Sequence, residues 1–516
     1  MAIPRFFDRI ADATLPLFEG VFRPDFHDRL AEAAVTLQAP EGMAADRAAY
    51  GGFLLAANLC ARLYPRISLQ ADEILVTRAA DLILSINPAC DVAESSASTD
   101  CVLSWDKQPS VPGIFISASG WNAVVDRAID RRQPACAPAA LVAAAIGVGE
   151  MFRSVFADLL QGKGRRAPSP GGFNLVTLEG WSETPGAREH YTLEQFHLVG
   201  AGAIGQAAVL TFRETGAEGL MTVVDDQTVT SSNLQRYLLT TDSDEGSSKT
   251  DLVERHLEGS QLRLEKVQVR WGHDPRASAG SARVVLVAVD TAPTRIDLQA
   301  AIPCRIYNAF TGPVDLGWSR HERFGIDPCL ACLYWPDRRQ PSRYELIAKA
   351  LGLHPLRVLS YIVTRIPIGS PLPSIGASLD LQPPPDAAQW VQRSLLEDIA
   401  DKFEIQDQGR WANVSVEDLY HDGICGGGIV AQDQPESEDI VVPLAHQSTI
   451  AGIMLATQLI VALDPELSLL RPAPIEARYD VLAPPAQILP RPRLRTDLCL
   501  CADSDFVDRY HRDCPD

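Results

Sequence analysis

A glycine pattern at residues 199–205, Val-Gly-Ala-Gly-Ala-Ile-Gly, is the first feature of the sequence that could do chemistry. Gly200, Gly202 and Gly205 match the G-x-G-x-x-G spacing, in which glycines form a tight turn and let backbone N–H groups approach a phosphate. Asp225 follows at the end of the next apolar run, where a carboxylate can accept hydrogen bonds from ribose hydroxyls. The spacing favours a nucleotide site over a purely structural glycine turn.

Polar residues farther along indicate which nucleotide would bind. Asn233, Arg236 and Lys249 bring an amide and two cations toward the same crevice. A dinucleotide needs no such pair of cations, whereas a triphosphate under attack does, because charge develops on the leaving pyrophosphate. Asp290 ends another apolar run and is suited to Mg²⁺, which binds carboxylates together with phosphate oxygens. These residues predict ATP and Mg²⁺; the alternative is that Arg236 and Lys249 are solvated surface charges.

The sequence contains eleven cysteines, which we expect to be thiols, metal ligands or nucleophiles rather than a disulfide framework. Two close pairs, Cys329 with Cys332 and Cys499 with Cys501, predict a Cys₄ zinc site that ties the C-terminal tail to the rest of the chain. Cys514 is a reserve ligand. The alternative is a set of buried or redox thiols.

Cys425 lies in the segment Asp-Gly-Ile-Cys-Gly-Gly-Gly at 422–428. Three glycines let the backbone approach an extended peptide C-terminus, and a partly exposed thiol near a positive site can become a thiolate nucleophile. The alternative is a small apolar residue capping a turn. His446 could orient the acyl group, but we favour a structural histidine at a helix start. The remaining cysteines are expected in the core: Cys60, Cys90, Cys101, Cys136 and Cys304.

The elements that must position these residues have an α/β pattern. A strand at 195–199, a helix at 203–214 and a strand at 220–224 form a βαβ unit. Because the carboxyl ends of parallel strands line one crevice, Gly200, Asp225 and Asp290 are expected to converge. Upstream, Ala-rich helical segments alternate with short strands, without a glycine loop. We predict an α/β domain at 1–185 and a Rossmann-like domain at 186–516, which includes a helical insertion at 337–440 and a tail at 465–516.

Composition restricts the partners. The chain has 516 residues, 46% hydrophobic and 22% charged, and a net charge of -20. An acidic surface disfavours nucleic acid and anionic membranes. We see no secretory signal and no run of roughly 18 apolar residues, so we expect a cytoplasmic protein.

The block from Gly200 to Asp290 resembles the adenylation domain shared by ubiquitin-activating enzymes and the bacterial ThiF and MoeB proteins. The resemblance covers about 195–335 and 440–463, and its motifs are specific in order and spacing. It implies that Asp225 binds ribose, that Asp290 positions Mg²⁺, and that phosphates are held by Asn233, Arg236 and Lys249. Tyr237 and Gln227 depart from the family pattern, but neither stands at a position with a direct role. The family often carries a structural zinc on two C-x-x-C pairs, from which Cys499-Leu-Cys501 departs by one residue.

These adenylation domains pair with a second copy that lends an N-terminal Arg to the phosphates, and the segment around Arg9 resembles that region; a surface Arg on a short helix is the alternative. By the same resemblance, 1–185 is a degenerate, inactive copy that completes a pseudo-dimer within one chain, and further homo-oligomers are possible. The segment at 138–156 is similar in character to 443–463, which hints at a duplication.

The resemblance implies that a ubiquitin-like protein is adenylated at its C-terminus, passed to Cys425 as a thioester and accepted by a conjugating enzyme. Among relatives, the activating enzymes of bacterial ubiquitin-like conjugation operons, associated with antiphage defence, are most similar. A sulfur-carrier adenylyltransferase is the nearest alternative. An NAD-dependent oxidoreductase and a catalytically silent scaffold are further alternatives.

Overall fold

The computed structural model describes residues 7–18, 23–93, 99–106, 108–109, 113–127, 133–160, 170–277, 282–312, 314–334, 443–473, 475–483, 485, 488–496 and 499–514. Met1–Trp335 and Val441–Asp516 belong to one compact unit. The predicted helical insertion at 337–440, with Cys425, lies outside the described residues.

The first sheet precedes the glycine motif in the chain. Its strand order is β3-β2-β1-β4-β5-β6-β7, parallel from β3 to β5 and antiparallel for β6 and β7. The strands are β1 (Ala34–Gln38), β2 (Arg66–Gln70), β3 (Asp91–Ala93), β4 (Cys101–Trp105), β5 (Gly113–Ser119), β6 (Asn122–Val125) and β7 (Gly171–Asn174). The helices are α1 (Phe7–Thr14), α2 (Arg23–Glu32), α3 (Arg47–Ala61), α4 (Glu73–Ile86) and α5 (Ala137–Val155).

The second sheet contains the glycine motif. Its order is β11-β10-β9-β12-β13-β14-β15-β16, parallel from β11 to β13 and antiparallel beyond, with β8 paired to β10. The strands are β8 (Tyr191–Thr192), β9 (Phe196–Val199), β10 (Ala217–Val224), β11 (Leu262–Val267), β12 (Val284–Val287), β13 (Arg305–Thr311), β14 (Asp315–His321), β15 (Glu476–Asp480) and β16 (Ile488–Arg491). The helices are α6 (Ala203–Glu214), α7 (Lys249–Leu257), α8 (Ala292–Ala300), α9 (Leu330–Tyr334), α15 (Ala445–Leu463), α16 (Pro465–Ser468) and α17 (Ser504–Asp513).

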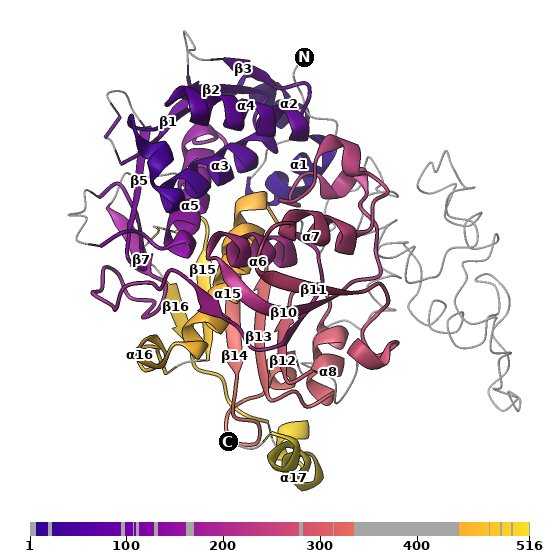
Figure 1. Ribbon diagram of the computed structural model, residues 1–516. Helices are drawn as coiled ribbons and strands as arrows, with labels where there is room; N and C mark the ends of the chain where they lie inside the picture. Colours follow the sequence, from indigo (N-terminus) through magenta and orange to yellow (C-terminus); the bar gives the residue numbers. More distant parts are fainter. Residues whose placement is uncertain are drawn as a thin grey trace, which may run out of the picture. The chain divides into compact units, whose positions relative to one another are not determined.

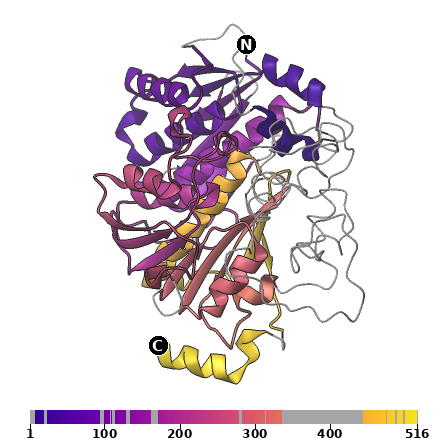
Figure 2. The ribbon, with the colours of Figure 1, turned by 90° about the vertical axis from the view of Figure 1, so that its right-hand side faces the viewer.

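The predicted α/β fold with mainly parallel sheets is therefore confirmed. β12 reads Val-Val-Leu-Val and is buried throughout, as expected for a parallel strand covered on both faces. α15 packs on α6, β13 and β14, so these helices cover one face of the second sheet (Figure 1). Figure 2 shows α17, in yellow, below that sheet.

The two sheets share one strand order. From β3 to β7 and from β11 to β15 the sequence of neighbours corresponds strand for strand, including the change to antiparallel pairing. In both, a long helix enters before the last corresponding strand: α5 precedes β7 and α15 precedes β15. This correspondence supports the duplication suggested by the similarity of 138–156 to 443–463.

The two corresponding helices form the centre of the unit. α5 and α15 are each 19 residues long and pack against one another. Both are long and apolar enough to cross a membrane by length and composition alone, but 89% of the relevant window is buried in each. In this fold they serve as core helices.

Gly452 allows α15 to approach α6. A Cβ at this position would lie 2.2 Å from the carbonyl oxygen of Ile204 and 2.6 Å from the Cβ of Ala207. We predict that Gly452→Ala lowers the free energy of unfolding by about 1–3 kcal/mol, because overpacking forces the helices apart. Urea denaturation measures the change. Gly186→Ala is the control, since no atom lies within 4 Å of its added Cβ; equal stability of the two variants would contradict the prediction.

Candidate functional site

The loop between β9 and α6 brings backbone segments closer than a side chain would allow. Gly200 has φ +97°, and a Cβ there would lie 2.6 Å from the carbonyl oxygen of Ala288. A Cβ on Gly205 would lie 2.0 Å from the carbonyl oxygen of Gly200. Gly202 is the N-cap of α6 and faces the Tyr237 hydroxyl, which a Cβ would approach to 3.3 Å. Because the first turn of α6 contains no acidic residue, its N-terminus suits an anion.

Asp225 follows β10 and holds the glycine loop through its carboxylate. Oδ2 accepts the backbone N–H of Ala201 at 2.8 Å, and Oδ1 accepts that of Gln227 at 2.9 Å. Burial raises the pKa of the Asp225 carboxyl, and the charge of Lys249 and the two backbone hydrogen bonds offset this rise only in part. The carboxylate is thus fixed beside the loop, in a place where it can accept a hydroxyl.

Lys249 is buried, with 4% of its surface exposed, at the start of α7. Its Nζ donates to Oε1 of Gln227 at 2.6 Å and lies 5.1 Å from the centre of the Tyr237 ring. Burial alone would lower the pKa of Lys249, but Tyr237 and Asp225 outweigh it and raise that pKa. Gln227 and Tyr237 were predicted to have no direct role, yet both contact the lysine. Their signal in the sequence was only their departure from the family pattern.

Arg236 approaches the same aromatic ring. Its Cζ lies 5.6 Å from the centre of Tyr237, so two cations converge on one ring. Its Nη1 is buried without a hydrogen-bond partner within the described part of the chain. Asn233 ends the turn η4 (Ser231–Asn233), and its Oδ1 accepts the N–H of Thr230 at 3.0 Å, which leaves the amide nitrogen as the donor of that side chain.

Asp290 lies in the turn between β12 and α8, with an exposed side chain. The N–H of Ala288 donates to the carbonyl of Val199 at 2.9 Å, which joins this turn to the strand before the glycine loop. Arg295 donates to the carbonyl of Val289 and so fixes the residue that precedes Asp290. Arg9 lies in α1, but its side chain is outside the described residues. The structure thus gathers the predicted nucleotide residues at one end of β9, β10 and β12, and leaves Arg9 and Cys425 untested.

Comparison with known proteins agrees with this geometry. The family model described as the ThiF family matches residues 184–499, which is more than half of the chain. The chain belongs to the ThiF family. This membership supports an adenylyltransferase activity, for which ATP is a suitable nucleotide.

Individual relatives of this ThiF-family chain differ in coverage. It is 28% identical to the uncharacterized protein y4jF of Sinorhizobium fredii (strain NBRC 101917 / NGR234), over 99% of this chain and 97% of that protein. It is 29% identical to the sulfur carrier protein ThiS adenylyltransferase of Escherichia coli (strain K12), over 31% of this chain and 64% of that protein. The crystal structure of E. coli MccB with MccA is 12% identical with a TM-score of 0.34, covering 60% of this chain and 67% of that one. A TM-score this low supports no functional conclusion.

A cluster of four thiols lies apart from the nucleotide residues. The Sγ atoms of Cys329, Cys332, Cys499 and Cys501 lie within 4.8 Å of one another. Cys329 is 3.3 Å from Cys499, and Cys332 is 3.5 Å from Cys501. Hydrogen bonds from the neighbouring thiols, that of Cys329 first, lower the pKa of the Cys332 thiol. Four sulfurs around a tetrahedral ion would be about 3.8 Å apart, so the cluster can hold a metal.

The cluster lies at the opposite end of the sheet from the glycine loop. Asp290 follows the carboxyl end of β12, whereas Cys304 precedes the first residue of the parallel strand β13. In the antiparallel register His321, the last residue of β14, pairs with Ile306. Cys329 follows this strand directly before α9, and Cys332 lies in α9. A closed site in this position is suited to a structural role.

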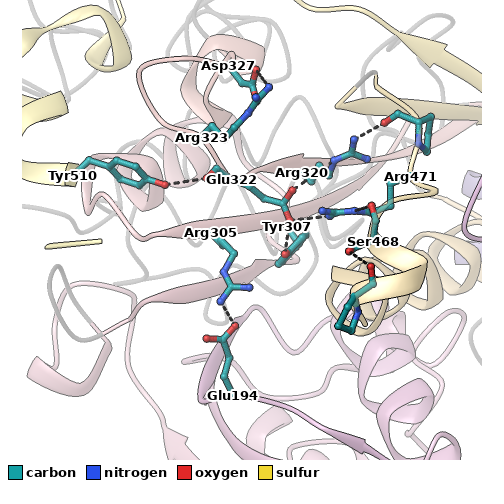
Figure 3. Close-up of polar contacts among 12 residues, drawn as sticks. Glu194, Arg305, Tyr307, Arg320, Glu322, Arg323, Asp327, Ser468, Arg471 and Tyr510 are labelled. Atoms are coloured by element: carbon teal, nitrogen blue, oxygen red, sulfur yellow. Dashed lines mark hydrogen bonds and ion pairs between the residues drawn. The ribbon is translucent and has the colours of Figure 1, made fainter. Parts of the chain in front are cut away.

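Figure 3 shows how the C-terminal tail is attached to the same region. The Tyr510 hydroxyl on α17 donates to the carbonyl of Glu322 at 2.9 Å, and the Glu322 carboxylate accepts from Tyr307 at 2.7 Å and from Arg471 at 2.8 Å. Burial would raise the pKa of the Glu322 carboxyl, but the hydrogen bond and charge of Arg471 outweigh burial and lower it. The Glu322 carboxylate is therefore charged, and it joins β13 to the segment that contains Arg471.

Two cysteine predictions are wrong. Cys304 and Cys514 form a disulfide across 210 residues, so Cys304 is not a free core thiol and Cys514 is not a reserve metal ligand. The position of α17 makes this pairing possible. The Tyr510 hydroxyl on this helix also donates to the carbonyl of Cys304 at 3.1 Å, so the end of the helix lies next to the start of β13. The Cα atoms are 5.4 Å apart, within the range for a disulfide.

Other predicted core residues are buried as expected. Cys60, Cys90, Cys101 and Cys136 are buried thiols. His446 is 4% exposed and packs near Gly149 and Phe152 of α5, with ring centres 6.3 Å apart for His446 and Phe152. Burial lowers the pKa of His446 to about 4, so it is neutral at pH 7 and serves the contact between α5 and α15.

The thiol cluster gives a direct prediction. We expect Cys332→Ser to lose the bound metal and to lower the thermal midpoint by at least about 5 °C, because metal binding contributes to folding. Elemental analysis and calorimetry measure both effects. Cys90→Ser is the control, since its Sγ already lies 3.7 Å from the carbonyl of Tyr64, which can accept from a hydroxyl. A wild-type protein purified without chelators that holds no metal would refute the prediction.

Proposed function

We propose that this chain adenylates the C-terminus of a ubiquitin-like protein at the expense of ATP. A carboxylate oxygen of the protein substrate attacks the α-phosphorus, the bond from that phosphorus to the pyrophosphate oxygen breaks, and an acyl-adenylate and pyrophosphate result. The observation that carries the proposal is the convergence of Lys249 and Arg236 on Tyr237 beside the glycine loop, with Arg236 Nη1 buried and unpaired within the described residues.

Like charges repel, and the two cations approach one aromatic ring. The negative charge that develops on a leaving pyrophosphate would relieve that repulsion more in the transition state than in the ground state, which is what accelerates a reaction. The backbone N–H groups at the start of α6 would hold phosphate oxygens, and Asn233 would donate its amide nitrogen. Asp225 would accept from ribose. Mg²⁺, when bound at Asp290, would neutralise phosphate charge.

We further propose a second step, in which the Cys425 thiolate attacks the carbonyl carbon of the acyl-adenylate and AMP leaves. The resulting thioester would be accepted by a conjugating enzyme. Support for this step is the glycine-rich surroundings of Cys425 and its place before α15 in a ThiF-family chain.

The first sheet is proposed to be the inactive partner of the second. β1 corresponds to β9, but the loop that follows β1 reads Ala39-Pro40-Glu41-Gly42. Pro40 has no N–H to donate, and Glu41 would repel a phosphate. In this arrangement Arg9 would reach the phosphates of the active half.

We infer that the metal held by the thiol cluster is zinc, since four cysteine sulfurs in a closed, tetrahedral site are typical of structural zinc. The ion would join α9 to the segment before α17. No step of the reaction depends on it.

A sulfur-carrier adenylyltransferase is the second candidate function, favoured by the similarity to the ThiS adenylyltransferase of E. coli over 165 residues. It shares the first step and needs no conjugating enzyme. Transfer of the thioester to a conjugating enzyme distinguishes the two.

Arg236→Gln tests the first step. We expect the rate of ATP–pyrophosphate exchange, measured with a ubiquitin-like protein encoded beside this chain, to fall roughly 10²–10³-fold. Arg283→Gln is the matched control, because Arg283 is exposed at the other end of β12. Equal exchange rates in both variants would contradict the role of Arg236.

Cys425→Ala tests the second step. The variant should retain pyrophosphate exchange but form no adduct that a thiol reductant releases on a gel. A reducible adduct that survives the substitution would refute Cys425 as the nucleophile, whereas loss of exchange as well would place Cys425 in the first step.

A further inference from the structure

Arg62 is a fully buried cation that the nucleotide chemistry does not use. It follows α3 as the C-cap in the N-terminal half, with 1% of its surface exposed. Burial lowers the pKa of Arg62 to about 9, so its guanidinium is charged at neutral pH. A buried charge persists only when its donors are paired, which makes its partners informative.

The guanidinium of Arg62 reaches into the second half of the chain. Nη1 donates to the carbonyl of Leu234 at 2.5 Å and to Oγ1 of Thr240 at 3.3 Å. Nη2 donates to the carbonyls of Leu238 at 3.1 Å and Thr240 at 2.9 Å. Nε is held by Oδ1 of Asn58 at 2.9 Å.

Asn58, one turn earlier on α3, adds a second connection. Its Nδ2 donates to the carbonyl of Leu238 at 3.0 Å. The segment 234–240 therefore turns around side chains of the other half, and three of its carbonyls point at one guanidinium. The guanidinium makes five hydrogen bonds here, to these three carbonyls, to Oγ1 of Thr240 and to Oδ1 of Asn58, whereas a Lys ammonium has only three donors.

The same segment carries the nucleotide residues Arg236 and Tyr237. It is also joined to the glycine loop: the N–H of Leu239 donates to Oε1 of Gln206 at 2.9 Å, and Nε2 of Gln206 donates to the carbonyl of Ala201 at 3.1 Å. A change in the path of 234–240 would move both the cation and the loop. Arg62 thus lies at the start of a chain of hydrogen bonds that ends at the phosphate-binding backbone.

We propose that Arg62 is a positioning residue, through which the N-terminal half shapes the segment 234–240 so that Arg236 meets the phosphates of ATP. This inference rests on the proposed nucleotide-binding function. It gives the first half a task in the second half's site that requires no phosphate loop of its own.

The test uses the full chain and two measurements. Calorimetric titration with ATP and Mg²⁺ gives Kd for the wild type, Arg62→Lys and Thr240→Val. Amide hydrogen exchange without nucleotide follows the N–H groups of Arg236, Tyr237 and Leu239, which are hydrogen-bonded in this segment. Arg153→Lys is the matched control, since Arg153 is also buried and also donates to a distant carbonyl, that of Ala483, away from 234–240.

We expect Arg62→Lys to weaken ATP binding roughly 10-fold and to speed exchange in 234–240, while the strands of both sheets stay protected. Thr240→Val removes one acceptor of Arg62 and also the hydrogen bond that the Thr240 hydroxyl donates to the carbonyl of Tyr237 at 2.6 Å. It should have an effect of the same kind, which keeps the test informative if Arg62→Lys does not fold. Arg153→Lys should change neither.

Different failures are distinguishable. Wild-type binding of ATP that Arg62→Lys and Thr240→Val leave unchanged overturns the inference alone. So does faster exchange in 234–240 without any loss of affinity, since Arg62 would then only stabilise the contact between the halves. A wild-type chain that does not bind ATP overturns the proposed function, and the inference with it.

Discussion

Backbone contacts too close for any side chain run from β12 through the glycine loop to the helices. The carbonyl oxygen of Ala288 lies 2.6 Å from the place that a Cβ of Gly200 would take. The carbonyl oxygen of Gly200 lies 2.0 Å from the place of a Cβ of Gly205, and the carbonyl oxygen of Ile204 lies 2.2 Å from the place of a Cβ of Gly452. Each contact brings the next element close, so the sheet, the loop, α6 and α15 form one closely packed stack. The N-terminus of α6 can offer its N–H groups to an anion only because this stack holds it at the edge of the sheet.

Three charged side chains, those of Asp225, Lys249 and Arg236, lie beside this stack. Asp225 holds the loop by the N–H of Ala201 and at the same time lies near Lys249, whose pKa it helps to raise. Lys249 and Arg236 are brought to one ring from different elements, the start of α7 and the segment after η4. The shape of that segment depends in turn on Arg62 of the other half. The N-terminal half, in which the loop after β1 reads Ala-Pro-Glu-Gly, thus contacts the segment that carries Arg236 through hydrogen bonds of Arg62 and Asn58.

The sequence predicted the parts of this arrangement that depend on local spacing. The glycines and Asp225 are set by one βαβ unit, where spacing determines position, and the cysteine pairs are set by ligand geometry. Contacts between distant segments were missed. Arg62 stands among Leu59, Cys60, Ala61 and Leu63, an apolar context that indicates burial but not a partner 172 residues away. Cys304 and Cys514 could not be paired, because the path of the tail depends on Tyr510 and the packing of α17. Gln227 and Tyr237 contact Lys249 only in the folded chain, so their sequence positions did not indicate these contacts.

The thiol cluster and the nucleotide residues share the second sheet but use its opposite ends. Catalytic groups gather where parallel strands end, since loops there can change without disturbing the ladder. The tail is attached near the amino end of β13 by three contacts. These are the cysteine cluster, the Cys304–Cys514 disulfide, and the hydrogen bond from Tyr510 to the carbonyl of Glu322. Because Arg471 and Tyr307 both donate to the carboxylate of Glu322, this residue also joins the segment after α16 to β13. The attachments of the tail and the predicted nucleotide residues therefore lie at opposite ends of β12 and β13.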